Sequence, residues 1–283
     1  MIALGYTMVY GIAQLINFAH GEIFMVGAYL GLTIYLAIQG FAFGPAGLVI
    51  LVPLIFIFTM LGCSALGALV EQTAYRPLHN APRLAPLITA IGVSFLLQNA
   101  VMLLYGPQDK YFPNLIPIHR FSFGAVTFTN LQMIIAAAAL ILMGLLNLVI
   151  MHTRTGKAMR ALAEDRQAAY LMGIPVNRVI TQTFVIGSAM AGAGGLMFGM
   201  YYNTINFHDG YLAGLKAFTA AVLGGIGNIP GALIGGILIG VLEGLGAGYL
   251  SSEWKNVFAF FILILILLFR PQGLLGTRVV KKL

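Results

Sequence analysis

Three acidic side chains lie inside or at the ends of apolar segments, where an ionisable group could carry ions across a membrane. Glu22 and Asp209 each follow a histidine closely, His20 and His208, whereas Glu243 falls well inside an apolar run. Ionisable groups within membrane segments are costly and commonly functional. These three acids are scattered along the sequence and lack obvious basic partners, so they give only weak support for a proton relay.

No motif in the chain completes a catalytic or nucleotide-binding set. His20-Gly21-Glu22 lacks the second histidine of a zinc-binding HExxH motif. Residues 155–158 (TGKA) resemble the end of a P-loop, but Met151 replaces its first glycine and Ala158 replaces the hydroxyl residue that would hold Mg²⁺. We therefore expect no enzyme activity, no metal site and no cofactor. The energy for any transport must come from an ion gradient or from a partner.

Composition decides the class of protein. The 283 residues are 60% hydrophobic and 8% charged, with a mean hydropathy of +0.94, whereas soluble domains are about 25% charged. An ordinary soluble enzyme, a nucleic-acid binder and a disordered chain are excluded. The single cysteine, Cys63, lies in an apolar run and is expected to be a small buried side chain. We expect one all-α, polytopic membrane domain over residues 1–283.

The chain contains eight apolar segments. They are continuously apolar, without the alternation of lipid-facing barrel strands, so they predict helices. The segments are residues 2–16, 23–38, 46–70, 84–105, 131–151, 179–202, 217–250 and 257–269.

Basic residues predict the orientation of these helices. The loop 152–178, the tail 270–283 and the loop 71–83 together hold 11 of the 15 lysines and arginines. Loops on the cytoplasmic side of a membrane collect such residues, so all three are expected inside the cell. The remaining four are expected outside: Lys110, Arg120, Lys216 and Lys255.

The glycine-rich segment 217–250 must then cross an even number of times. Its first arm, 217–227, is too short to span a bilayer of about 30 Å. We expect a broken or re-entrant helix that turns at Asn228, Pro230 and Gly231; a plain helical hairpin is the alternative. The glycines spaced four apart in this segment favour close helix packing.

The segment 106–130 is expected to be an external loop. Its prolines argue against a helix, and the alternation of Phe121, Phe123, Val126 and Phe128 predicts a small β-hairpin. The loop either contacts an outside partner or is a lid without one.

The loop 152–178 is the richest polar segment. Met159, Leu162, Ala169 and Met172 share one face of a helix over 158–173. Gly173 and Pro175 should end this helix, and Asn177 can cap the next. The helix either lies in the lipid interface or docks into a groove on a cytosolic motor.

A short echo links two parts of the chain. Residues 16–22 (INFAHGE) resemble 205–210 (INFHDG), and each follows an apolar segment. If this is a repeat rather than coincidence, we expect a parallel one, with 1–16 and 179–202 running the same way and 23–38 broken like 217–250. Matching positions of repeats line binding sites in carriers. The polar residues expected near a translocation path are Asn17, His20, Asn206 and Asp209; a structural role is the alternative.

Four stretches together resemble the branched-chain amino-acid ABC importer permeases of the LivH type: residues 3–11, 16–22, 161–173 and 216–231. The resemblance implies a multi-pass subunit of the bacterial inner membrane, paired with a second, LivM-like permease. It also implies two cytosolic ATPases that hydrolyse the ATP and an extracytoplasmic substrate-binding protein. The residues that it implies for coupling to the ATPases are Glu164, Ala168, Ala169 and Gly173.

One departure concerns the start of the chain. Members of this family usually begin with roughly twenty more residues, enough to complete the first span. The first apolar segment here starts near Met1, so we expect either a misplaced start codon or a truncated first span.

The leading hypothesis is therefore a permease that moves branched-chain or similar amino acids by alternating access, driven by partner ATPases. A urea or amide importer of the same family is one alternative. An ion-coupled secondary carrier that acts alone is a second, and it would depend on Glu243. A channel or structural membrane subunit, which would need no cytosolic partner, is a third.

Overall fold

Long apolar helices make up the structure, a computed structural model. It describes residues 1–13, 17–39, 45–79, 81–82, 84–124, 126–249, 251, 254–270 and 272–276. Six helical stretches among these are long and apolar enough to cross a membrane, and two shorter apolar helices accompany them near the two ends of the chain. The chain is therefore a multi-pass, nearly all-helical membrane protein, as the apolar segments predict. The tail residues 277–283, including Arg278, Lys281 and Lys282, lie outside the described residues, as does Arg83.

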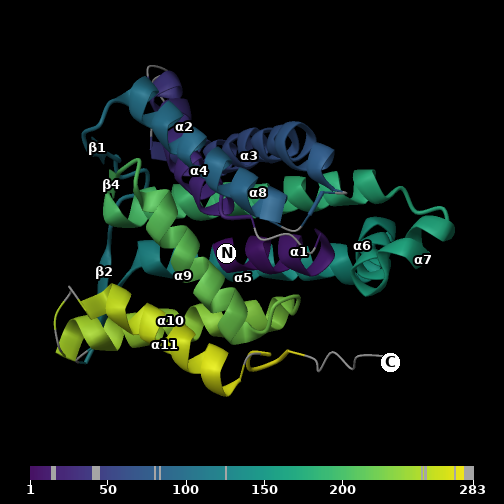
Figure 1. Ribbon diagram of the computed structural model, residues 1–283. Coiled ribbons are helices and arrows are strands. Elements are labelled where there is room, and N and C mark those ends of the chain that lie inside the picture. Colours follow the sequence, from purple (N-terminus) through teal and green to yellow (C-terminus); the bar gives the residue numbers. More distant parts are fainter. Residues whose placement is uncertain are drawn as a thin grey trace.

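The helices follow the predicted segments closely. The order is α1 (Ile2–Ala13), α2 (His20–Ile38), α3 (Pro45–Val70), η1 (Glu71–Tyr75), η2 (Arg76–Leu78), α4 (Leu84–Tyr105), β1 (Lys110–Tyr111), β2 (Arg120–Phe123), β3 (Val126–Thr129), α5 (Asn130–His152), α6 (Arg154–Glu164), α7 (Arg166–Leu171), α8 (Val176–Tyr202), β4 (Thr204–Ile205), α9 (Asp209–Gly224), α10 (Ile229–Tyr249) and α11 (Lys255–Phe269). Figure 1 shows the strands at one end of the bundle and α6 and α7 at the other. We call these the strand end and the α6–α7 end.

Helix α8 lies at the centre because small residues on it let three neighbours approach closely. A Cβ built on Gly187 would lie 3.2 Å from the Val9 side chain of α1, and one on Gly192 would lie 2.6 Å from Cys63 Sγ of α3. A Cβ on Gly195 would clash with the backbone of α2. The hydrophobic effect does not drive helices together within lipid, so close packing at these glycines stabilises the contacts instead. Cys63 is fully buried there, as expected.

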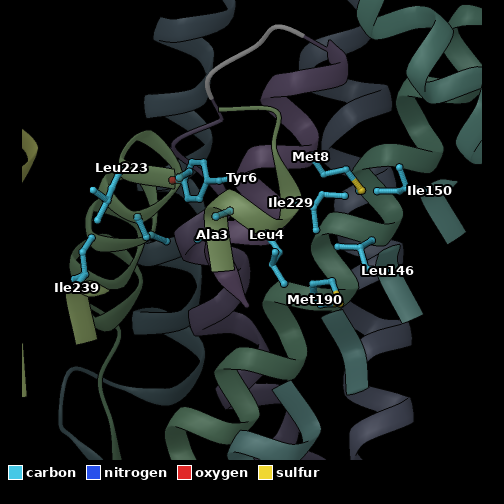
Figure 2. Packing of buried hydrophobic residues seen from close by; sticks show 14 residues of the cluster. Ala3, Leu4, Tyr6, Met8, Leu146, Ile150, Met190, Leu223, Ile229 and Ile239 are labelled. Atoms are coloured by element: carbon cyan, nitrogen blue, oxygen red, sulfur yellow. The ribbon is translucent and has the colours of Figure 1, made fainter. Parts of the chain in front are cut away.

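A large apolar cluster joins α1 to helices from the second half of the chain. Figure 2 shows Leu4 and Met8 of α1 beside Met190 of α8 and the α5 residues Leu146 and Ile150. The same cluster continues into α9 and α10. Helix α1 is therefore held by packing on several sides.

Two short antiparallel pairs occupy the strand end. β1 pairs with β4, so that Lys110 lies opposite Ile205. β2 pairs with β3, and Phe121 lies opposite Phe128, with their rings 5.8 Å apart. Thr129 then starts α5 with a capping box that it shares with Gln132. Ala125, in the expected turn, lies outside the described residues.

The break in the glycine-rich segment lies slightly earlier than predicted. Helix α9 starts at Asp209, has 16 residues and ends at Gly224, and α10 starts at Ile229. Pro230 and Gly231 thus belong to the first turn of α10, where proline needs no hydrogen-bond partner. Asn228 precedes them, and its Oδ1 accepts a hydrogen bond from Gly231 N at 2.9 Å. Helices α9 and α10 pack closely on each other on either side of this break, with Gly224 against Gly231 and Gly235 against Ala220.

The predicted parallel repeat is wrong. Val9 of α1 packs against Gly187 of α8, whereas Ile2 packs near Gly194, so α1 and α8 run in opposite directions. Helix α2 is one continuous helix rather than a broken one. The two similar motifs lie between α1 and α2 and between α8 and α9. The six matching residues give no information on the direction of the helices, because a short motif has the same sequence whichever way its helix crosses the bundle.

Candidate coupling segment and translocation residues

The predicted single helix over 158–173 is two helices. Asp165 has extended backbone dihedrals (φ −153°, ψ 114°), which end α6 and open α7. Its carboxylate accepts hydrogen bonds from Gln167 N at 2.8 Å and from Ala168 N at 3.0 Å. Aspartate at this place caps the new helix by satisfying its first free N–H groups. The predicted continuous face is therefore interrupted in its middle.

Three of the four apolar residues of that face are buried nonetheless. Met159, Leu162 and Ala169 pack with Val179 and Ile180 of α8. Met172 is the exception, because α7 ends at Leu171 before it; its side chain is 83% exposed. The α6–α7 segment thus rests on the bundle through Met159, Leu162 and Ala169, and Met172 is the one residue of this face that stays exposed.

The tip of α7 carries an apolar surface of which the helical pattern singled out only Met172. Tyr170, Leu171 and Met172 are 71%, 83% and 83% exposed. Gly173 has a φ of +78°, and Ile174 N donates to Ala169 O at 3.0 Å, which closes the helix end. We call residues 170–172 the α7 tip. The sequence signal for it was the apolar run directly before a helix-ending glycine.

The predicted coupling residues differ in their surroundings. Glu164, Ala168 and Gly173 are exposed, but Ala169 is buried against the bundle. The predicted capping role of Asn177 is wrong, since α8 starts at Val176 with Pro175 before it. Proline fixes the backbone there and leaves Asn177 in the first helical turn.

A groove of about 1150 Å³ lies beside the α7 tip, between η1, α7 and the start of α8. Three arginines line it, Arg76, Arg166 and Arg178, together with amide side chains and Tyr170. No acidic residue is among the described residues that line it. The groove is therefore a cationic surface at the α6–α7 end.

Asn17 and His20 are buried where α1 and α2 meet. Tyr75 OH donates to Asn17 Oδ1 at 2.7 Å. The ring of His20 packs edge-on against Tyr6, with ring centres 5.0 Å apart. Neither ring nitrogen of His20 has a hydrogen-bond partner within the described part of the chain. His20 is therefore held by packing, and Asn17 by one hydrogen bond.

Asn206 and Asp209 lie at the strand end instead. Asp209 Oδ2 accepts from Asn206 N at 2.7 Å, at the start of α9. The Asn206 side chain donates to Asp109, in the loop before β1. The four predicted path residues therefore lie in two separate places, Asn17 and His20 at the α1–α2 junction and Asn206 and Asp209 at the strand end, with no hydrogen bond between the two that the structure describes.

The two motifs touch through their glycines rather than their polar side chains. A Cβ on Gly21 would lie 2.3 Å from Gly210 O and 2.7 Å from Gly214 Cα. Next to this contact, Glu22 is buried and accepts a hydrogen bond from Ser94 at 3.1 Å. Helices α2 and α9 thus cross at backbone contact, with a carboxylate beside the crossing.

The third acid is paired, which the sequence reasoning missed. Lys216 Nζ of α9 lies 2.9 Å from Glu243 Oε1 of α10. Lys216, one of the four basic residues expected outside, lies in the middle of α9. Residues 27 positions apart give no local signal of contact; only the packing of α9 on α10 brings them together. Glu243 therefore has a cationic partner, Lys216.

Replacing Lys216 by methionine should lower the free energy of unfolding by roughly 2–3 kcal/mol, because Glu243 is left charged in an apolar segment. The double replacement Lys216→Met with Glu243→Met should recover most of this loss. Thermal unfolding of the purified chain in detergent measures both. Equal destabilisation by the single and the double replacement would show that the ion pair does not join α9 to α10.

The comparisons with known proteins match nearly the whole chain to one kind of protein. The family model "Branched-chain amino acid transport system / permease component" matches residues 1–267. The chain is 46% identical to the high-affinity branched-chain amino acid transport system permease protein LivH of Escherichia coli K12, over 100% of this chain and 92% of the relative. It is 46% identical to BraD, the corresponding permease protein of Pseudomonas aeruginosa, with the same coverage.

A more distant relative is the permease protein LivM of Escherichia coli K12, which is 25% identical over 97% of this chain and 67% of the relative. No solved structure matches the chain. The full-length matches accord with the membrane helices and with the family resemblance of the motifs. The chain belongs to the family of permease components of branched-chain amino acid transport systems.

Proposed function

We propose that this chain is the permease subunit of an ABC importer in the bacterial inner membrane and that it moves branched-chain amino acids by alternating access. The observation that carries the proposal is the 46% identity over the whole chain to permease proteins of high-affinity branched-chain amino acid transport systems. The similarity covers 100% of this chain, so every helix of the bundle lies within it. The substrate class is therefore assigned through these relatives.

The proposed energy source is ATP, hydrolysed by two cytosolic partners, since the chain needs no cofactor of its own in this account. The α7 tip supports this, because it presents three exposed apolar side chains on a short, capped helix. Such a helix suits a groove on a partner protein. The cationic groove beside it would complement acidic side chains around that groove.

The α6–α7 end is proposed to face the cytosol, and the strand end to face the outside. Arg154, Lys157, Arg160, Arg166 and Arg178 gather at the α6–α7 end, which is the distribution that cytoplasmic loops show. A second, LivM-like permease is the proposed partner within the membrane, and the distant similarity to LivM supports a pair of related folds. A substrate-binding protein would then deliver the amino acid to the strand end.

Within this account, Asn17 and His20 are proposed to lie near the inner part of the path, and Asn206 and Asp209 near its outer mouth. Their separation into two places supports two stations along a path rather than one site. Glu164, Ala168, Ala169 and Gly173 stay the proposed coupling positions, with Ala169 anchoring α7 to the bundle.

Uptake by the assembled transporter tests the substrate class. The chain is reconstituted in vesicles with its partner permease and ATPases, and the binding protein is supplied outside with labelled leucine. We expect ATP-dependent leucine uptake that excess isoleucine or valine suppresses and that urea or acetamide leaves unchanged. Suppression by urea or acetamide, with little effect of valine, would assign the chain to an amide importer instead.

A further inference from the structure

The segment after α3 buries a carboxylate that the proposed transport cycle does not use. Glu71 is the first residue of η1, a π-helical turn, and its side chain is fully buried. An ionised carboxylate is expensive to bury unless cations and hydrogen-bond donors compensate it. Single π turns are rare and frequently occur at functional sites. The carboxylate and the π turn together need an explanation beyond packing.

Glu71 ties η1 to the start of α8. Thr181 Oγ1 of α8 donates to Glu71 Oε2 at 2.6 Å, and Arg76 Nη2 donates to Thr181 Oγ1 at 3.0 Å. Arg76 Nε and His79 Nε2 lie 3.6 and 3.7 Å from Glu71 Oε1. Burial, followed by the charge of Arg166, lowers the pKa of His79. Arg76 is therefore the permanently charged partner that faces Glu71.

The other end of the same π turn reaches the junction of α1 and α2. Tyr75 is fully buried, and its hydroxyl donates to Asn17 Oδ1 at 2.7 Å. Asn17 is itself buried, three residues before α2 begins. Five consecutive residues thus join two parts of the bundle that are distant in sequence, α8 through Glu71 and the α1–α2 junction through Tyr75.

Helix α7 connects directly to this arrangement. Only four residues separate the end of α7 at Leu171 from the start of α8 at Val176, and Ile174 N donates to Ala169 O across that turn at 3.0 Å. Thr181 follows in the second turn of α8. A displacement of α7 therefore reaches Thr181 through a short, hydrogen-bonded stretch of backbone.

We propose that Glu71 is a positioning residue for energy coupling: it locks η1 to Thr181, so that a displacement of α7 is passed through Tyr75 to the Asn17 junction. The lock makes the start of α8, η1 and that junction move as one unit. This inference rests on the proposed function, because it needs an ATPase that displaces α7. It adds a residue outside the coupling segment that the sequence motifs single out.

Glu71→Gln tests the lock, since glutamine keeps an oxygen for Thr181 but loses the charge that faces Arg76. Tyr75→Phe tests the second link with the removal of one hydroxyl. Thr73→Val is the matched control, because Thr73 lies in the same π turn, is exposed, and its hydroxyl donates to Leu69 O at the end of α3, one turn earlier in the chain. Each variant is reconstituted as the full transporter, and leucine uptake and ATP hydrolysis are measured on the same vesicles.

We expect Glu71→Gln and Tyr75→Phe to lower the leucine transported per ATP hydrolysed by about fivefold or more, the size of a typical coupling energy, while ATP hydrolysis without substrate persists. Thr73→Val should match the wild type. A purely structural role would reduce transport and hydrolysis in parallel through loss of folded protein. An unchanged ratio in folded Glu71→Gln transporter would overturn the proposal.

A distance measurement decides the question even if Glu71→Gln fails to assemble. Spin labels at Thr73 and Arg178, both exposed, report on the distance between η1 and the start of α8 in a Cys63→Ser chain with Glu71 intact. We expect the same distance with and without ATP. A distance that changes on ATP binding would contradict the lock. Wild-type transporter that hydrolyses ATP without moving leucine would refute the proposed function instead.

Discussion

Gly21→Ala should leave little folded protein, although it adds a single methyl group. The new Cβ would meet Gly210 O at 2.3 Å and Gly214 Cα at 2.7 Å, and both atoms belong to the backbone of α9. Backbone cannot move aside as a flexible side chain can, so α2 and α9 would have to separate. Overpacking of this kind costs about 3 kcal/mol or more when the neighbours cannot relax. The yield of monodisperse chain in detergent and its thermal midpoint measure the loss.

Gly144→Ala is the matched control, since it makes the same change in α5. A Cβ on Gly144 meets no atom within 4 Å, and alanine favours a helix over glycine by about 0.5–1 kcal/mol. We expect this variant to be as stable as the wild type or slightly more stable. Equal stability of Gly21→Ala and Gly144→Ala would show that α2 and α9 do not meet at their glycines.

Leu171→Glu should abolish ATP-driven transport while the chain itself still folds. Leu171 is 83% exposed in the α7 tip, so the free energy of unfolding should change by no more than about 0.5 kcal/mol. A charge placed in the apolar centre of a docking contact costs far more, and hot-spot residues lose roughly 2–4 kcal/mol on substitution. We therefore expect the affinity for the ATPases to fall by at least about thirtyfold.

Leu171→Met provides the control, because it keeps an apolar side chain of similar size. It should bind the ATPases and transport leucine as the wild type does. Ala169 is a poor place for such a test, since it is buried, and a large residue there would disturb the packing of α7 on α8. Normal ATPase binding by folded Leu171→Glu would exclude the α7 tip as the docking surface.

Much of the fold was predictable because each membrane helix can be recognised from the composition of its own segment. The eight apolar segments correspond to helices, and the break in the glycine-rich segment lies within a few residues of its predicted place. The family was also predictable, since whole stretches such as residues 161–173 carry it. These features depend on residues that are close together along the chain.

The interpretations that failed depend on contacts between distant residues or on a single backbone residue. The helix over 158–173 divides because Asp165 caps a new helix more favourably than it continues the old one. The direction of the repeat, the pairing of Lys216 with Glu243 and the network of Glu71 all require helices to be placed beside each other. Burial of Glu71 had only one faint signal, an acid directly after a long apolar run.

The central claim is that ATP hydrolysis by partner subunits drives amino-acid transport through this chain. The most direct test measures labelled leucine uptake in vesicles that hold the chain and its partner permease, with and without the ATPases, under ATP or under a proton or sodium gradient. We predict accumulation only when the ATPases and ATP are both present with the binding protein. Accumulation driven by a proton or sodium gradient in the vesicles without the ATPases would contradict the account and identify an ion-coupled carrier.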